Sequence, residues 1–213
     1  DISNVQSLDT LYCEGNQLTS LILPDSLRLL HCNNNQLISL DVSNYSNLKD
    51  LECYSNNLSD LNLDSCSNLI TLKCSENNIT SLDVSNNLLL EFIMCMNNQM
   101  MSLILNDNAL TFLNCSFNNL TAIDVSYNQN LKTAYVFMNQ LSSLNINGAD
   151  SLIKLTASYN NLSSLDLRNG NNINMNLIIK ENPNLTCISV DDTAWQTLTG
   201  LLVTILIFNI ILV

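Results

Sequence analysis

The stretch LKDLECYSNNLSDLNLDSCSN at residues 48–68 contains the pattern that decides the fold. It opens on Leu48, continues with the alternating triplet Leu51-Glu52-Cys53, and reaches Asn56 where that alternation ends. In a strand buried on one face, successive side chains point to opposite sides, so Leu51 and Cys53 are expected to face a core and Glu52 to face solvent. A single unit of this kind cannot cover its own apolar face, which means that it needs neighbouring copies of itself.

The same unit recurs along the chain with a period of 19 to 21 residues. The apolar openings are Leu8, Leu27, Leu48, Leu69, Leu90, Leu110, Leu131, Leu152 and Ile173. Each of the first eight is followed by an asparagine at the same spacing: Asn16, Asn35, Asn56, Asn77, Asn98, Asn118, Asn139 and Asn160. The second half of the unit alternates again, as in LISLDVSN at 37–44 and ITSLDVSN at 79–86. This regularity predicts stacked coils with two short strands in each.

The recurring asparagine has a physical role in such a stack. It lies where the chain leaves the first strand and turns, so the backbone groups there have no ladder partners and are costly to bury alone. An amide side chain donates and accepts hydrogen bonds, so it can satisfy them. We therefore expect the eight asparagines to form a structural ladder along the axis.

The repeat LxxLxCxxNxLxxLDVSxNxx resembles the leucine-rich-repeat family, in particular its short bacterial variant of about 21 residues. The resemblance implies a right-handed superhelix of the α/β leucine-rich-repeat class, rich in strand and poor in helix, with a parallel sheet on its concave face. It divides the chain into an N-terminal edge (1–7), a repeat domain of about nine coils (8–190), and a cap remnant with an apolar tail (191–213). The segment NPNLTCISVDDTAW at 182–195 is similar to the C-terminal cap of secreted and surface proteins of bacteria, so a secreted or cell-surface location is expected.

Composition excludes one class of partner. Asp and Glu number 19 against 7 Lys and Arg, and the resulting net charge of −12 would repel a phosphate backbone. Nucleic acid is therefore not an expected partner. The apolar segment TGLLVTILIFNIILV at 199–213 is too short to span a bilayer, and a truncated or frame-shifted end, a cap over the last coil and a membrane anchor remain alternatives for it.

Six of the eight cysteines share one position of the repeat: Cys13, Cys32, Cys53, Cys74, Cys95 and Cys115. Val136, Ala157 and Ile178 take this position in the last three coils, which indicates a buried column of thiols acting as small apolar groups. Disulfides between coils are the alternative, but parallel side chains about 4.8 Å apart suit a bridge poorly. Cys66 and Cys187 lie outside the column, and Cys187 is expected to be a free thiol.

No catalytic residue, metal site or cofactor site is predicted. His31 is the only histidine, and we expect it to be a solvent-facing strand residue without a nucleophile beside it. Asp41, Asp83, Asp124 and Asp166 recur in the second half of the coil, yet Ile22 and Ile104 occupy the same column. A calcium site would not tolerate isoleucine, so these carboxylates are interpreted as solvated.

The outward positions of the first strand are the candidate binding positions, because the repeat does not require a particular residue there. The middle outward column is Tyr12, His31, Glu52, Lys73, Met94, Asn114, Tyr135, Thr156 and Leu177. With its two neighbouring columns it forms an apolar and aromatic patch in coils five to seven: Phe92, Met94, Met96, Phe112, Tyr135 and Phe137. Such patches mark interaction sites, although aromatic residues also simply suit strands. The polar stretch of coils one to four is a second candidate surface.

Three functions are compatible with these sequence features. The first is a noncatalytic module, expected to be a monomer, that recognises a protein or a glycan through the concave sheet. The alternative is a structural or adhesive spacer on a bacterial surface. An enzyme is not expected, because the sequence offers no nucleophile motif, metal constellation or phosphate loop.

Overall fold

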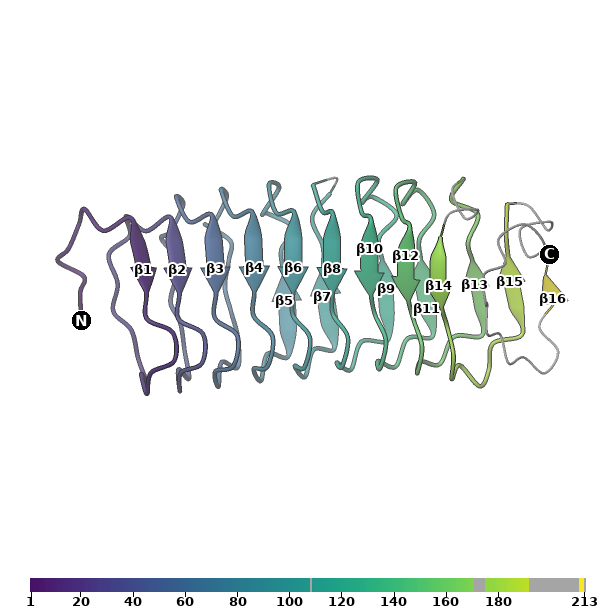
Figure 1. The fold of residues 1–213 in the computed structure, drawn as a ribbon, viewed down its shortest axis with the longest axis horizontal. Coiled ribbons are helices and arrows are strands. Elements are labelled where there is room, and N and C mark those ends of the chain that lie inside the picture. The colour runs from purple at the N-terminus through teal and green to yellow at the C-terminus, as the bar shows by residue number, and fades with distance from the viewer. Residues whose placement is uncertain (108, 171–174, 192–210, 213) are drawn as a thin grey trace.

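A computed structural model of the chain shows a single stack of coils (Figure 1). The structure describes residues 1–107, 109–170, 175–191 and 211–212. The opening residue Ile173 and most of the apolar tail therefore lie outside the described residues. None of the described segments forms a helix with the length and apolarity that crossing a bilayer requires.

One long parallel sheet runs the length of the stack, with one strand from each coil (Figure 1). Its nine strands, in spatial order, are β1 (Thr10–Tyr12), β2 (Leu29–His31), β3 (Asp50–Glu52), β4 (Thr71–Lys73), β6 (Phe92–Met94), β8 (Phe112–Asn114), β10 (Thr133–Tyr135), β12 (Lys154–Thr156) and β14 (Asn176–Ile178). Neighbouring strands pair in strict register, so Leu51 lies beside Leu30 and Leu72. The predicted parallel-sheet solenoid is confirmed.

Shorter sheets form on the other side of the coils. They contain β5 (Ser81–Asp83) with β7 (Ser102–Ile104), β9 (Ala122–Asp124) with β11 (Ser143–Asn145), and β13 (Ser164–Asp166) with β15 (Cys187–Ser189) and β16 (Ile211–Leu212). The two strands expected in every coil are therefore present from coil four onward. In the first three coils the described residues form a strand only in the first half.

The core fills the space between the two sides and follows the predicted periodicity. Leu27, Leu48, Leu69, Leu90, Leu110, Leu131 and Leu152 are fully buried, as are the middle residues of most strands. The ninth coil departs from the predicted alignment. Leu177 is 5% exposed and belongs to the core, whereas Ile178 is 40% exposed and Ile179 takes the place of the buried thiols. Leu177 follows its register partner Leu155 by 22 residues, whereas Leu155 follows Ala134 by 21. The additional residue lies ahead of β14 and moves the side chains of this strand to the face opposite the predicted one.

The asparagine ladder exists and links each coil to the one before it. Asn98 Nδ2 donates to the carbonyl oxygens of Cys74 and Cys95 at 3.0 and 3.2 Å, and its Oδ1 accepts from the backbone N–H of Ile79 at 3.0 Å. The pattern repeats from Asn35 to Asn160, while Asn16 bonds only within its own coil. Asn182 adds a further member that was not predicted from the sequence, because the additional residue ahead of β14 shifts its position.

Candidate functional site on the open face of the sheet

The outward side of the nine-stranded sheet, here called the open face, presents two residues from each strand. In each of β2, β3, β4, β6, β8 and β10 the middle residue is buried and the first and third are half-buried. Strict register stacks these outward residues into columns that run along the solenoid. The chemistry of the open face is therefore set by nearest neighbours in adjacent coils.

An aromatic row crosses β6, β8 and β10. The rings of Phe92 and Phe112 stack with centroids 4.4 Å apart and an interplanar angle of 6°. The ring of Tyr135 follows Phe112 at 5.8 Å, tilted by 60°. Three residues that the sequence pattern assigned to one patch thus form a continuous row of contacting rings. Offset and tilted ring pairs of this kind stabilise each other beyond the area they bury.

The other patch residues continue this surface. Met96 Sδ accepts a hydrogen bond of 3.4 Å from Asn114 Nδ2, and Met94 lies beside Asn114 in the register of the sheet. Phe137 packs against Phe117 with centroids 5.0 Å apart in an edge-to-face arrangement. All six predicted patch residues are half-buried, so each side chain is held by neighbours and still reaches solvent.

Three apolar side chains at the border of this patch were not predicted from the sequence. Phe117, Met138 and Tyr159 are 38%, 40% and 52% exposed, and their backbones have positive φ angles of 55°, 52° and 57°. Left-handed backbone disfavours bulky residues, and coil one places Gly15 at this position. The signal was present in the sequence: a large apolar residue directly before the ladder asparagine in coils six to eight.

A cation borders the aromatic row at β12. Lys154 Nζ lies 5.0 Å from the centroid of the Tyr135 ring, within the range of a cation–π interaction. The patch therefore ends at a positive charge on its C-terminal side.

A polar cluster occupies the open face at β2, β3 and β4. Lys73 Nζ bonds Glu52 Oε1 at 2.5 Å, and His31 Nε2 lies 3.7 Å from the same oxygen and 3.6 Å from Asp50 Oδ1. The ring of Tyr12 meets the imidazole edge-on, with centroids 5.0 Å apart. His31 lies on the open face of the sheet, as expected, but its neighbours leave its side chain only 18% exposed. Burial raises the pKa of Asp50, although the adjacent imidazole opposes that shift.

The thiol column lies beneath both surfaces. Cys32, Cys53, Cys74, Cys95 and Cys115 are fully buried, and Cys13 at the first coil is partly exposed. Burial raises the pKa of Cys32, Cys74 and Cys115 to about 12, so these groups are protonated thiols at neutral pH. A thiol in this form is a poor nucleophile, which supports the interpretation of the column as packing.

Cys66 belongs to a second column that was not predicted from the sequence. Its Sγ lies 3.5 Å from the carbonyl oxygen of Val42, in the coil before it. Tyr45 Oη and Asn87 Nδ2 make the equivalent bonds, to the carbonyl oxygens of Leu23 and Leu63. These side chains close the coils on the side away from the asparagine ladder.

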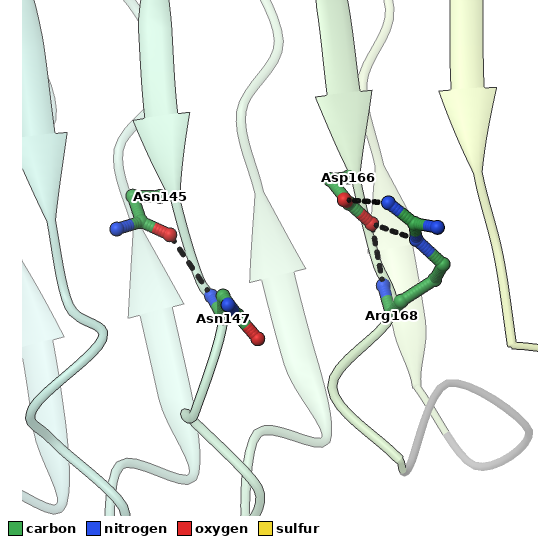
Figure 2. Close-up of polar contacts among 4 residues, drawn as sticks. All are labelled: Asn145, Asn147, Asp166 and Arg168. Atoms are coloured by element: carbon green, nitrogen blue, oxygen red, sulfur yellow. Dashed lines mark hydrogen bonds and ion pairs between the residues drawn. The ribbon is translucent and has the colours of Figure 1, made fainter.

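The recurring carboxylates of the second half-coil bind backbone. Asp166 Oδ1 accepts from the Arg168 N–H at 3.0 Å and the two side chains form a bidentate pair, while Asn145 makes the same turn to Asn147 at 3.1 Å (Figure 2). The hydrogen bonds from Arg168 lower the pKa of Asp166. An asparagine can replace the aspartate in this turn, which explains why the column does not require a charge.

The architecture matches solved structures. The chain is similar to the functional domain of InlJ from Listeria monocytogenes, which includes a cysteine ladder, with 30% identity and a TM-score of 0.77 over 89% of this chain and 46% of that one. The chain is a leucine-rich-repeat solenoid. This solenoid also shares its fold with YopM from Yersinia enterocolitica (24% identity, TM-score 0.72, 98% of this chain and 42% of that one). A leucine-rich-repeat protein of Leptospira interrogans matches at 22% identity and a TM-score of 0.63, over 79% and 51%.

The leucine-rich-repeat chain thus spans about half the length of these solved proteins. No protein-family model and no curated protein sequence matches it. The predicted repeat class is confirmed by the InlJ and YopM comparisons together with the register of the sheet.

Proposed function

We propose that this leucine-rich-repeat solenoid is a noncatalytic recognition module, secreted or surface-exposed in a bacterium, that binds a protein through the apolar patch of coils five to seven. The patch comprises Phe92, Met94, Met96, Phe112, Tyr135 and Phe137, with Phe117 and Met138 at its border. The similarity to bacterial leucine-rich-repeat proteins, InlJ among them, supports the location and the general role.

The observation that carries the proposal is the row of rings from Phe92 through Phe112 to Tyr135 on the open face. Neighbouring coils show that the scaffold does not need these rings, because Thr71 and Thr133 hold the Phe column and Thr156 follows Tyr135. Aromatic anchors grouped at the centre of a patch dominate the affinity of protein interfaces. Phe117 and Met138 keep bulky side chains on left-handed backbone, at a conformational cost that folding alone does not require.

The test compares the protein with a variant whose substitutions come from its own coils: Phe92→Thr, Phe112→Thr and Tyr135→Thr. Both are screened by biolayer interferometry against purified extracellular proteins and glycans, and circular dichroism confirms that both fold. A control variant with Met101→Ser and Tyr127→Ser removes two apolar side chains, each 68% exposed, that lie outside the nine-stranded sheet.

We expect a protein ligand that binds the parent and the control, and that loses at least about 30-fold in affinity, or about 2 kcal/mol, with the threonine variant. Equal binding by the folded threonine variant would contradict the patch as the recognition site. Absence of any ligand for the parent would favour a structural or adhesive spacer.

A further inference from the structure

The polar cluster at β2 and β3 places three metal-ligating side chains on one side of the sheet. Asp50 and Glu52 are the first and third residues of β3 and so project to the same face. His31 ends β2 and pairs with Glu52 in the register of the sheet. One imidazole nitrogen and two carboxylate oxygens of these residues lie within 4.8 Å of one another.

Two atoms of this cluster are left unsatisfied. The 3.6 Å separation of His31 Nε2 and Asp50 Oδ1 is too long for a hydrogen bond. Both atoms are shielded from solvent, and within the described part of the chain neither has a hydrogen-bond partner. Buried polar atoms are almost always paired in folded proteins, so this nitrogen and this oxygen are both available to a shared ligand.

The two distances from the imidazole nitrogen are close to those expected around a metal ion of the size of zinc. Zinc binds nitrogen and oxygen ligands at about 2.0–2.2 Å, and a tetrahedral arrangement then places two ligand atoms about 3.3–3.6 Å apart. His31 Nε2 lies 3.6 Å from the Asp50 oxygen and 3.7 Å from the Glu52 oxygen. We propose that His31, Asp50 and Glu52 form a binding site for a divalent transition metal of the zinc class, with a fourth coordination position open to water.

The neighbours of the site set the orientation of its ligands. The edge-on contact with Tyr12 fixes the plane of the imidazole ring. Lys73 holds Glu52 through Oε1, and its positive charge lies beside the position that the ion would take. Lys73 therefore competes with the metal, and its removal strengthens binding.

The sequence provides an unusually direct probe, because His31 is the only histidine. Metal-free protein in a non-thiol reductant is titrated with Zn²⁺ by calorimetry, and with paramagnetic Co²⁺ while the imidazole resonances are followed by NMR. We expect one equivalent of Co²⁺ to shift or broaden the His31 resonances without the intense near-ultraviolet absorption of cobalt bound to thiolate. Thiolate absorption with unperturbed His31 resonances would overturn the proposal, as would no change in those resonances at millimolar metal.

Four variants separate a metal site from an ordinary ion-pair cluster. His31→Ala and Asp50→Asn each lower the Zn²⁺ affinity on the order of 100-fold, because each removes one of three ligands. Asp60→Asn removes a charge from an exposed carboxylate in the same coil and leaves the affinity unchanged. Lys73→Met, which copies Met94 of the next coil, raises the affinity about 10-fold by removing the competing cation.

Circular dichroism shows which of these variants fold. If His31→Ala is unstable, Asp50→Asn still tests the site, because asparagine has nearly the same shape as aspartate. Folded Asp50→Asn and His31→Ala proteins that bind Zn²⁺ as tightly as the parent would refute the site. A Lys73→Met protein that binds more weakly than the parent would also refute it, because an ion that Lys73 helps to hold is not one that competes with it.

Discussion

Strands β2, β3 and β4 and strands β6, β8 and β10 belong to the same sheet and have the same register, yet they present opposite chemistry to solvent. The first stretch carries His31, Asp50, Glu52 and Lys73, of which Lys73 and Glu52 form an ion pair. The second carries the ring row that begins with the stacked pair Phe92 and Phe112. Under both stretches the same positions of the coil are buried and apolar, and the asparagine bonds repeat.

This contrast separates the residues that build the coil from those that are free to vary. Replacing a buried leucine changes the scaffold of every coil that touches it, whereas the outward columns change from polar to aromatic within two coils without a change in register. A protein of this design can therefore hold two independent sites on one face. Substitutions of buried and ladder residues should therefore have similar effects on stability in the two stretches, whereas substitutions of outward residues should have different effects.

The largest expected effect is a loss of stability at alkaline pH. An exposed thiol has a pKa of 9.0 and the buried Cys74 thiol has a pKa of about 12, so the folded state holds its proton more tightly than the unfolded state. The contribution of this thiol to stability is fully present below about pH 9 and is lost as the pH rises from 9 towards 12, by at most about 1.4 kcal/mol per pH unit. Urea denaturation at about pH 8 and pH 10 measures the change.

Tyrosines also ionise in this range, and burial raises the pKa of Tyr45, so a matched variant is needed. The double variant Cys74→Ala with Cys95→Ala places at both positions the alanine that Ala157 provides in a later coil. It should lose less stability between about pH 8 and pH 10 than the parent, because it lacks two of the thiols that ionise on unfolding. Hydrogen exchange should show faster exchange of the backbone amides in β2, β3 and β4 and in β6 and β8 alike. A pH dependence that is the same in parent and variant would contradict this account.

The next effect concerns the ladder. Asn56→Ala and Asn98→Ala should each lower the free energy of unfolding by about 3–5 kcal/mol, because each leaves several buried backbone groups without partners. Chemical denaturation measures both, with the exposed neighbour Asn57→Ala as the control near zero. A difference of more than about 1 kcal/mol between the two ladder variants would show that the stretches do not share one scaffold.

A smaller effect tests the aromatic surface. A double-mutant cycle of Phe92→Thr and Phe112→Thr should give a coupling energy of about 1 kcal/mol, since the stacked rings stabilise each other. The pair Phe92 and Tyr12, at distant strands of the same sheet, should be additive. Additivity of Phe92 with Phe112 would mean that the row contributes only strand propensity.

The smallest effect is at the polar surface. Lys73→Met should change the free energy of unfolding by less than about 1 kcal/mol, because a partly exposed ion pair loses in desolvation much of what it gains in attraction. Raising the salt concentration should reduce the difference from the parent. Arg168→Ala, at a more exposed pair on the other side, is the control. A loss above about 2 kcal/mol would make the polar cluster part of the scaffold.

Sequence alone predicted the fold because the same pattern occurs in nine successive coils. The spacing of Leu48, Cys53 and Asn56 specifies a strand, a core residue and a turn, and strict register then places the outward columns. The prediction failed at β14, where one additional residue ahead of the strand exchanged the faces of Leu177 and Ile178. A single inserted residue cannot be detected when the positions of a coil are extrapolated from the period of the preceding coils.

The candidate sites were less predictable. The six patch residues do share one surface, since columns follow from register. The low exposure of the His31 side chain was not predicted, because it depends on how the side chains of Tyr12, Asp50 and Glu52 lie against it from neighbouring strands. Phe117 was missed because its outward direction comes from a left-handed backbone that strand alternation does not anticipate.

The asparagine ladder also has a direction, which matters while the chain is being made. Asn56 Oδ1 accepts from the N–H of Leu37, which precedes it by 19 residues, and its Nδ2 donates back to the carbonyl oxygen of Cys32. During synthesis from the N-terminus, each turn thus waits for the following coil to leave the ribosome before its backbone is satisfied. The last coil of the growing solenoid therefore always has turn backbone groups without their asparagine partner. A premature stop at a coil boundary would leave those groups of the last coil unpaired in the final protein.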